Sequence, residues 1–455
     1  MRICFASTLY PGLHNRWGGA EVACQRLHNL LKKESHRVAV VTTRPDPRVR
    51  GGGRLPAEGG AYGDQGSVDG LEHYSVPTVA DYLGRTAAMA LDTLIPFDAL
   101  AYRPMLRLLD TVRPEVVHLH SFKELTFSVL SAAKRRKLPV FFSLYDLWAL
   151  CPQSNLAHYR GGTCPPTTYA GRGRSHMGFG CLACAVPARK PLVLFRRIFF
   201  EHFLPQIDGF IVLSDTVKRQ LAEFGLPRRK ISVLPLPLFE QFVPRSPKAP
   251  PTAGHPPPPG NPWASKPGAG LDDRSILFAG WMIRPKGLHI LIEAMPSVLA
   301  RVPEAKVLVV ETGAHAEHKA GFQRRIAELG LTHKFHFLGK KNAKEIQALL
   351  ARASVVAVPE QWGIAWPIFC TEAMSYGKPI AASRIGDIPR FIRDGETGRL
   401  FDPQSPEQLA DCLVSFFDDP AAALRMGRRA QDFILDACDP GRITATLLKL
   451  YEEVL

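Results

Sequence analysis

The sequence contains no apolar run long enough to cross a membrane as a helix, which takes roughly 18–20 residues. Its first residues also lack a secretory signal, because a short apolar stretch runs into a glycine turn at Gly18 and Gly19. The nine cysteines are an odd number in a chain of 455 residues, unlike the disulfide framework of a small secreted protein. We therefore expect a cytoplasmic protein, with peripheral binding to the inner face of the plasma membrane left open.

Positive charge is in excess, with 57 Lys and Arg against 42 Asp and Glu, a formal net charge of +15. No basic stripe with interleaved aromatic residues accompanies it, so nucleic acid is not an expected partner. An anionic membrane surface would account for the charge, as would anionic substrates such as nucleotide diphosphates. A genome whose base composition favours arginine codons would also account for the positive charge. The charge alone does not decide between these three explanations.

Short apolar strands alternate with amphipathic helices, a pattern typical of α/β folds with parallel, doubly wound sheets. In the first half we expect strands at 2–9, 37–43, 115–119, 139–144 and 209–213. In the second half we expect strands at 275–279, 306–310, 334–338, 354–358 and 379–382, and helices at 287–301, 317–329, 343–351 and 368–376. A segment rich in Pro, Gly, Ala and Ser separates the halves and cannot bury enough apolar surface to order itself. The expected parts are a Rossmann-like domain, a linker, a second Rossmann-like domain and a terminal helix, at 1–243, 244–274, 275–438 and 439–455.

Glycines and cations stand where expected strands lead into helices. The pair Gly18-Gly19 lets backbone N–H groups approach a ligand at a helix N-terminus, although a plain tight turn would look the same. There is no Gly-x-Gly-x-x-Gly, so dinucleotide binding is not supported. Arg284 and Lys286 follow a strand at the edge where such sheets bind ligands, and they would face a diphosphate or be ordinary surface cations. Glu372 is expected to start a helix, where its carboxylate would suit a ribose diol or simply the helix dipole.

These segments occur in the order and spacing of a known family. The residues concerned are Gly18–Glu21, Gly280–Gly287, Pro359–Ile380 and Arg384–Phe401. Together they resemble the large retaining family-four glycosyltransferases, or glycosyl transferases group 1, which include bacterial sugar and mannosyl transferases. The resemblance implies the GT-B fold, in which two Rossmann-like domains with doubly wound parallel sheets face a central cleft.

The resemblance also implies roles for individual residues. The first domain would lie on the acceptor side, and the second would bind the nucleotide sugar. Lys286 would neutralise the leaving diphosphate, which lowers the barrier without a catalytic metal, and Glu372 would bind the ribose. The residues placed at the donor by this resemblance are Gly18, Gly19, Arg284, Lys286, Gly363, Ile368 and Glu372.

Three positions depart from the family pattern. Trp281 stands where the family usually has an arginine, and Arg284 is the candidate to reach the same phosphate. The family has a second glutamate eight positions before Glu372, but this chain has Ile364 there.

Glu360 is the nearest acid to that position, and we expect a catalytic role for it. In place of the family's His-Asp the chain has Tyr145-Asp146, with His120 at a neighbouring strand end. We therefore expect His120 and Asp146 to be catalytic as well.

Four cysteines lie within residues 151–184, a Gly-rich segment that we interpret as an insertion in the first domain. They are Cys151, Cys164, Cys181 and Cys184. Their number and the closing Cys-x-x-Cys suit a structural zinc site. A redox disulfide, unligated thiols and an iron–sulfur centre are the alternatives.

The function expected from these features is transfer of a hexose from a nucleotide-diphosphate sugar to a hydroxyl, with retention, in surface polysaccharide or glycolipid assembly. The acceptor would be a glycan or a lipid-linked molecule. Residues 189–204 combine cations with apolar side chains and would lie on an anionic membrane or pack on the sheet. The alternatives are a catalytically degenerate sugar-nucleotide-binding relative and an epimerase or phosphorylase on the same fold.

Overall fold

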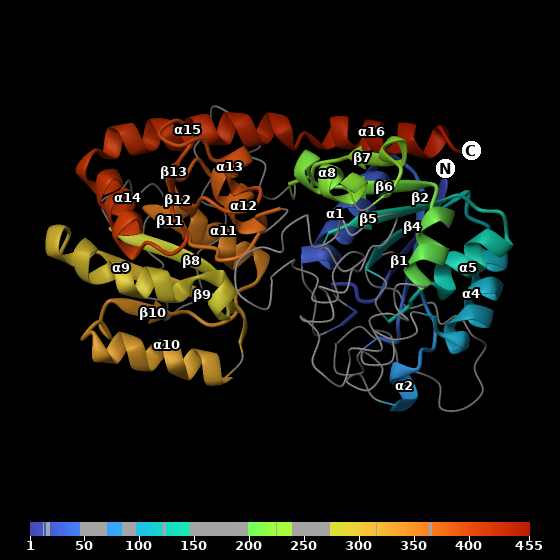
Figure 1. The fold of residues 1–455 in the computed structure, drawn as a ribbon, viewed down its shortest axis with the longest axis horizontal. Helices are drawn as coiled ribbons and strands as arrows, with labels where there is room; N and C mark the ends of the chain where they lie inside the picture. Colours follow the sequence, from blue (N-terminus) through green and yellow to red (C-terminus); the bar gives the residue numbers. More distant parts are fainter. Residues whose placement is uncertain are drawn as a thin grey trace. The chain divides into compact units, whose positions relative to one another are not determined.

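A computed structural model of the chain shows two compact units. The residues that it describes are 1–11, 13–14, 19–45, 71–83, 97–121, 124–145, 199–223, 225–238, 274–314, 316–363 and 366–455. The first unit consists of Met1–Pro237 and Pro440–Leu455, and the second of Leu238–Asp439. Each unit contains one parallel sheet with helices packed on it (Figure 1). The predicted α/β fold class with two doubly wound sheets is confirmed.

The first unit has a seven-stranded sheet in the order β3-β2-β1-β4-β5-β6-β7, with parallel neighbours throughout. The strands are β1 Arg2–Ser7, β2 Arg37–Thr42, β3 Glu72–Ser75, β4 Val116–Ser121, β5 Val140–Leu144, β6 Gly209–Val212 and β7 Ile231–Val233. The helices are α1 Gly19–Lys33, α2 Ala80–Leu83, α4 Ala99–Val112, α5 Ser128–Arg135 and α8 Asp215–Glu223. β1 is buried from Ile3 onward, as expected for a parallel strand covered on both faces. Because β1 pairs with β2 on one side and β4 on the other, the strand order reverses between β1 and β4.

The last helix, α16 Pro440–Glu452, belongs to the first unit. Its Ile443, Leu447 and Tyr451 are buried in the same apolar cluster as Ile3 and Phe5 of β1. The chain therefore returns from the second unit to complete the core of the first. This connection was not part of the sequence prediction, which treated 439–455 as a segment of its own.

The second unit has a six-stranded parallel sheet in the order β10-β9-β8-β11-β12-β13. The strands are β8 Ser275–Met282, β9 Lys306–Ala314, β10 Phe335–Phe337, β11 Val355–Val358, β12 Ile380–Ser383 and β13 Arg399–Phe401. The helices are α9 Leu288–Arg301, α10 Ala316–Glu328, α11 Ala343–Arg352, α12 Ile368–Ser375, α13 Ile388–Phe391, α14 Pro406–Asp418 and α15 Pro420–Ala437. Here the strand order reverses between β8 and β11.

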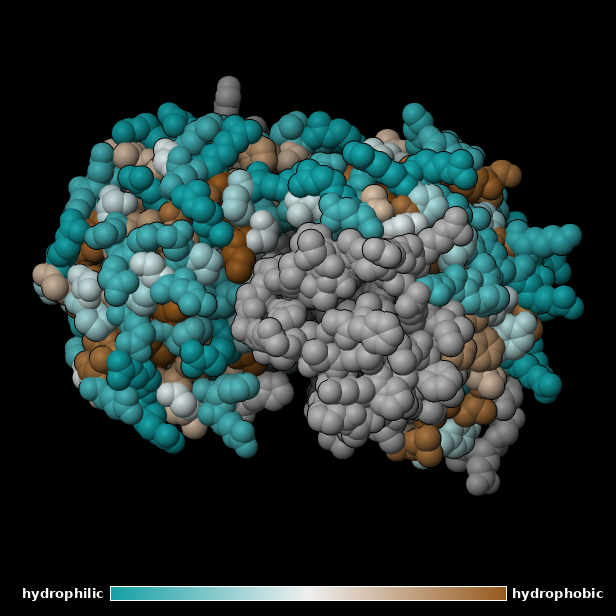
Figure 2. All heavy atoms as spheres, in the orientation of Figure 1, coloured by the Kyte–Doolittle hydropathy of each residue, from teal (hydrophilic) through white to brown (hydrophobic). Residues whose placement is uncertain are grey.

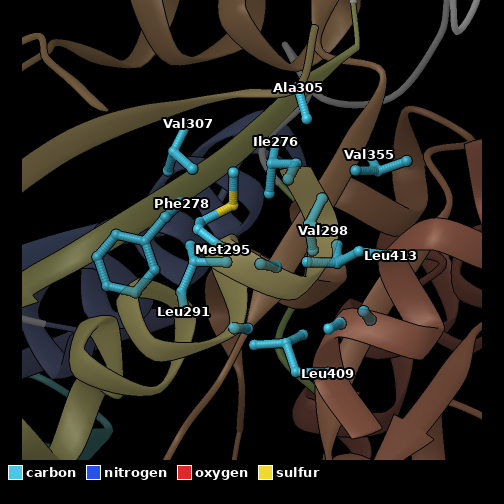
Figure 3. Packing of buried hydrophobic residues seen from close by; sticks show 14 of the residues in the cluster. Ile276, Phe278, Leu291, Met295, Val298, Ala305, Val307, Val355, Leu409 and Leu413 are labelled. Atoms are coloured by element: carbon cyan, nitrogen blue, oxygen red, sulfur yellow. The ribbon is translucent and has the colours of Figure 1, made fainter. Parts of the chain in front are cut away.

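The core of the second unit forms where α9 and α14 pack on the sheet (Figure 3). Leu291, Met295 and Val298 recur along one face of α9 at helical spacing, and each is fully buried. Ile276 and Val307 come from neighbouring strands of the sheet and belong to the same cluster. This packing fixes the position of β8, the strand that leads into the candidate site.

In the face drawn in Figure 2, the coloured residues are mostly hydrophilic, and hydrophobic ones occur singly or in small groups. Within the described part of the chain, no helix combines the length and the apolar character needed to cross a membrane.

Candidate functional site

The carboxyl ends of β8 and β11 flank the point where the strand order of the second sheet reverses. In open α/β sheets, ligands bind just outside the strand ends at such a point. The loop after β8 holds Arg284–Lys286 in a single 3₁₀ turn, and the loop after β11 holds Glu360 to Gly363. Two segments that lie 74 positions apart in sequence therefore meet at one edge.

These two loops are packed tightly against each other. Gly287 has a φ of 76°, and a Cβ built there would lie 1.6 Å from the carbonyl oxygen of Pro359. Only glycine combines that backbone conformation with so close an approach. The N–H of Gln361 donates to the carbonyl oxygen of Pro285 at 2.8 Å, which joins the loops a second time.

Lys286 and Glu360 form an ion pair across the junction. Lys286 Nζ lies 2.5 Å from Glu360 Oε1, and the side chains are only 19% and 9% exposed. The indole Nε1–H of Trp362 donates to the other oxygen, Glu360 Oε2, at 2.8 Å. The ammonium group also lies over the Trp362 ring, 5.6 Å from its centroid. Both oxygens of the carboxylate therefore have a hydrogen-bond partner.

Two other side chains, one near the end of β8 and one in the loop after it, are more open. Arg284 is exposed, and no carboxylate among the described residues pairs with it. Trp281 is 41% exposed, which is unusual for so large an apolar group. Arg284 is thus an available cation beside the paired Lys286.

Glu372 lies in the second turn of α12, so the expectation that it starts this helix is wrong. The helix begins at Ile368, and Pro367 directly before it occupies the N-cap position. Glu372 is buried at 8% exposure. α12 follows β11, so its N-terminal half lies at the same edge of the sheet as Lys286.

No side chain caps the N-termini of α9 and α12, the helices that follow β8 and β11. By contrast, Asn342, Ser405 and Asp419 cap α11, α14 and α15 with side-chain oxygens. The N–H groups at the starts of α9 and α12 therefore suit an anionic ligand.

His120 is buried near the end of β4, beside the reversal point of the first sheet. Its Nδ1 shares a hydrogen bond of 2.8 Å with the Tyr145 hydroxyl, and its Nε2 has no partner among the described residues. Burial, with a contribution from His118, holds the pKa of His120 well below its usual range. Burial also raises the pKa of the Tyr145 phenol. Both groups are therefore neutral at physiological pH.

Gly19 is the first residue of α1, as the sequence indicates. Gly18, Asp146 and the cysteines Cys151, Cys164, Cys181 and Cys184 lie outside the described residues. Within the described ranges, no group of three or more His, Cys, Asp and Glu could hold a metal ion. The roles expected for all these residues remain predictions.

Sequence reasoning did not foresee the partners of two candidate residues. Lys286 and Glu360 were both named, but their pairing and the contribution of Trp362 were not. The only available signal was that β8 and β11 flank the reversal of the strand order, which places their loops side by side.

Two family models match the chain. The model described as Glycosyltransferase Family 4 matches residues 17–238, and the model described as Glycosyl transferases group 1 matches residues 262–433. The second match contains Lys286, Glu360 and Glu372, and the first contains His120 and Tyr145.

Curated relatives include the D-inositol 3-phosphate glycosyltransferases of Corynebacterium glutamicum and Arthrobacter. The first is 31% identical over 166 residues, which are 36% of this chain and 40% of the relative. The second is 32% identical over 156 residues, which are 34% of this chain and 37% of the relative. These matches thus span about two fifths of the length of each relative.

The overall fold is similar to that of Anabaena HepE, solved in complex with UDP-glucose. The TM-score is 0.64 with 15% identity, and the match covers 99% of each chain. At this identity the likeness concerns the fold alone.

Proposed function

Because the chain belongs to the family 4 and group 1 glycosyltransferases, we propose that it transfers a hexose from a nucleotide-diphosphate sugar to a hydroxyl, with retention of configuration. The observation that carries the donor assignment is Lys286, a mostly buried cation at the ligand-binding edge of the second sheet. The binding of UDP-glucose by HepE supports the same class of donor.

The donor would be bound by complementary charge. Lys286, Arg284 and the uncapped N-termini of α9 and α12 offer positive potential to the diphosphate. Glu372, on the same α12, offers a carboxylate for the ribose diol. As the glycosidic bond breaks, negative charge grows on the leaving diphosphate, and these fixed groups stabilise it. Backbone groups from Gly363 to Ile368 would contact the sugar.

On the acceptor side we propose His120, Tyr145 and Asp146. His120 is neutral, so its ring can accept a hydrogen bond from an incoming hydroxyl. Tyr145 orients the ring through the bond at Nδ1, and Nε2 is buried without a partner among the described residues, so it would serve an acceptor hydroxyl only if the surrounding side chains move.

For the acceptor we propose an anionic or lipid-linked molecule used in surface polysaccharide or glycolipid assembly. The net charge of +15 supports an anionic acceptor, and so do the relatives named for inositol 3-phosphate. Weak binding to an anionic membrane is part of this proposal. Flotation with anionic liposomes at low salt tests it, and protein that stays at the bottom of the gradient would argue against it.

A panel of nucleotide sugars tests the donor assignment by thermal shift, because a ligand that binds the folded state at free concentration L stabilises it by RT ln(1 + L/Kd) and so raises the unfolding temperature. We expect one donor to stabilise the wild type and the Lys334→Ala control, whose lysine precedes β10 at the opposite edge of the sheet. Lys286→Ala should lose most of this shift. An equal shift in Lys286→Ala would remove Lys286 from the donor site.

The rival function is a sugar-nucleotide-binding relative without catalysis. Trp281, Ile364 and Tyr145 favour it because each replaces a residue typical of the family. Donor binding without hydrolysis or transfer, over a panel of glycan, lipid and inositol phosphate acceptors, would select this alternative. Formation of a glycoside whose anomeric configuration matches that of the donor would exclude it.

A further inference from the structure

The lysine assigned to the diphosphate has an anionic partner within the chain. Lys286 Nζ contacts Glu360 Oε1 at 2.5 Å, and both side chains are largely shielded from water. The pair carries no net charge, so Lys286 offers little attraction to a diphosphate while the pair is intact. A second anion placed beside Glu360 would also be repelled, since like charges interact strongly where solvent screening is weak.

Glu360 is held in this position by more than the lysine. Trp362 Nε1–H donates to its second oxygen at 2.8 Å, and Trp362 follows Gln361, whose N–H is bound to the β8 loop. The close approach of Gly287 to Pro359 fixes the distance between the two loops. The loop after β11 therefore holds the Glu360 carboxylate in this position in addition to the ion pair with Lys286.

We propose that Glu360 is a resident counter-ion that exchanges with the donor diphosphate on Lys286. When the diphosphate enters, Lys286 Nζ transfers its contact from Glu360 Oε1 to a phosphate oxygen, and Trp362 keeps the carboxylate close by. When the nucleoside diphosphate product is present, the same carboxylate competes for Lys286 and promotes release. Glu360 is thus a positioning residue that lowers product affinity. This inference rests on the proposed donor site.

The charge-neutral variant Glu360→Gln isolates this effect. Glutamine keeps the shape of the side chain, and its oxygen can still accept the hydrogen bond from Trp362. Removing the competing charge should tighten binding of UDP by roughly tenfold in isothermal titration, since charge pairs at a binding site alter affinity on this scale. The KM for the donor should fall, and kcat should fall with it if product release limits turnover.

Three further variants separate failure of this inference from failure of the proposed function. Lys286→Ala should weaken UDP binding in the wild-type background. In the Lys286→Ala background Glu360→Gln should give a smaller gain than in the wild type, because only the direct repulsion between Glu360 and the diphosphate remains to be removed. Glu360→Asp keeps the charge, and it controls for a change in loop structure because it should not tighten binding.

The outcomes are distinct. If the wild type binds neither UDP nor inorganic pyrophosphate, or if Lys286→Ala has no effect, the donor site itself is wrong. If Lys286→Ala weakens binding while Glu360→Gln leaves it unchanged or weakens it, the donor site stands and the counter-ion exchange is overturned.

Discussion

The hydroxyl of Tyr451 and Nδ1 of His118 lie 2.5 Å apart, although the two residues are 333 positions apart in the sequence. His118 Nε2 is paired with the hydroxyl of Ser143 at 2.8 Å, so both ring nitrogens have partners in the core. The ring of His118 lies 4.1 Å, centroid to centroid, from that of His120. Tyr451 of α16 therefore holds the ring of His118 in place, and that ring packs against His120, a candidate catalytic residue.

Substituting Tyr451→Phe should lower the free energy of unfolding by about 1–3 kcal/mol, because it leaves a buried ring nitrogen without its partner. Urea unfolding followed by circular dichroism measures this change. Tyr82→Phe is the matched control, since Tyr82 is 67% exposed and should tolerate the change. Equal stability of Tyr451→Phe and the wild type would show that the hydrogen bond contributes nothing.

Acid should destabilise the first unit because His28, His73, His118 and His120 are all buried in the neutral form. Burial lowers the pKa of His28 and His73 to about 4 and that of His118 to about 3. In the unfolded chain these groups bind protons near the usual value of 6.5, so the unfolded state takes up protons first as the pH falls. Their contribution to stability is complete above about pH 6.5 and is lost as the pH falls toward 4.

At pH 5 the loss should reach about 2 kcal/mol for each of His28 and His73, on the scale of 1.36 kcal/mol per pKa unit. Urea unfolding between pH 7.5 and 5 tests this directly. His73→Gln should reduce the pH dependence, while His333→Gln, at an exposed position, should not. A wild-type stability that is constant over this range would contradict the buried neutral histidines.

The sequence predicted the strands that carry the site because central parallel strands are long, continuous apolar runs. β1, β4, β8 and β11 were all expected within a few residues of their observed bounds. β3, β7 and β13 were missed. Each is an edge strand of only three or four residues, although the equally short edge strand β10 was expected at 334–338.

The contacts between the side chains of the candidate site could not be predicted from the sequence. Residue types and motif order singled out Lys286 and Glu360 separately. Their contact depends on how the two loops lie against each other and on a glycine at position 287, where an added Cβ would lie 1.6 Å from the Pro359 carbonyl oxygen. No local sequence pattern encodes either feature. The link between Tyr451 and His118 depends in turn on the return of the chain to the first unit.

Gly287→Ala should disrupt the donor site. The new Cβ would overlap the Pro359 carbonyl, so the two loops must separate and the Lys286–Glu360 pair must break. We expect a loss of stability of about 3 kcal/mol and at least tenfold weaker binding of the donor.

Gly330→Ala is the matched control for backbone strain. Gly330 has a similar φ of 69°, but a Cβ there meets nothing within 4 Å. It should cost about 1 kcal/mol in unfolding free energy and leave donor binding unchanged. Equal effects of the two substitutions would mean that the contact with Pro359 is unimportant.

Zinc analysis tests the prediction made for the four clustered cysteines. Protein purified without chelator should contain about one zinc ion per chain if all four are ligands. Cys181→Ser together with Cys184→Ser should abolish metal binding, and Cys412→Ser, a cysteine outside the cluster, should not. Metal-free protein with four titratable thiols in this segment would exclude the zinc site.

The central claim is that the second unit binds a nucleoside diphosphate at the edge formed by β8 and β11. A crystal structure of the complex with UDP tests it most directly. The account predicts a phosphate oxygen within about 3 Å of Lys286 Nζ, the ribose hydroxyls on the carboxylate of Glu372, and Glu360 displaced from the lysine. A nucleotide bound elsewhere, with the Lys286–Glu360 pair intact, would contradict it.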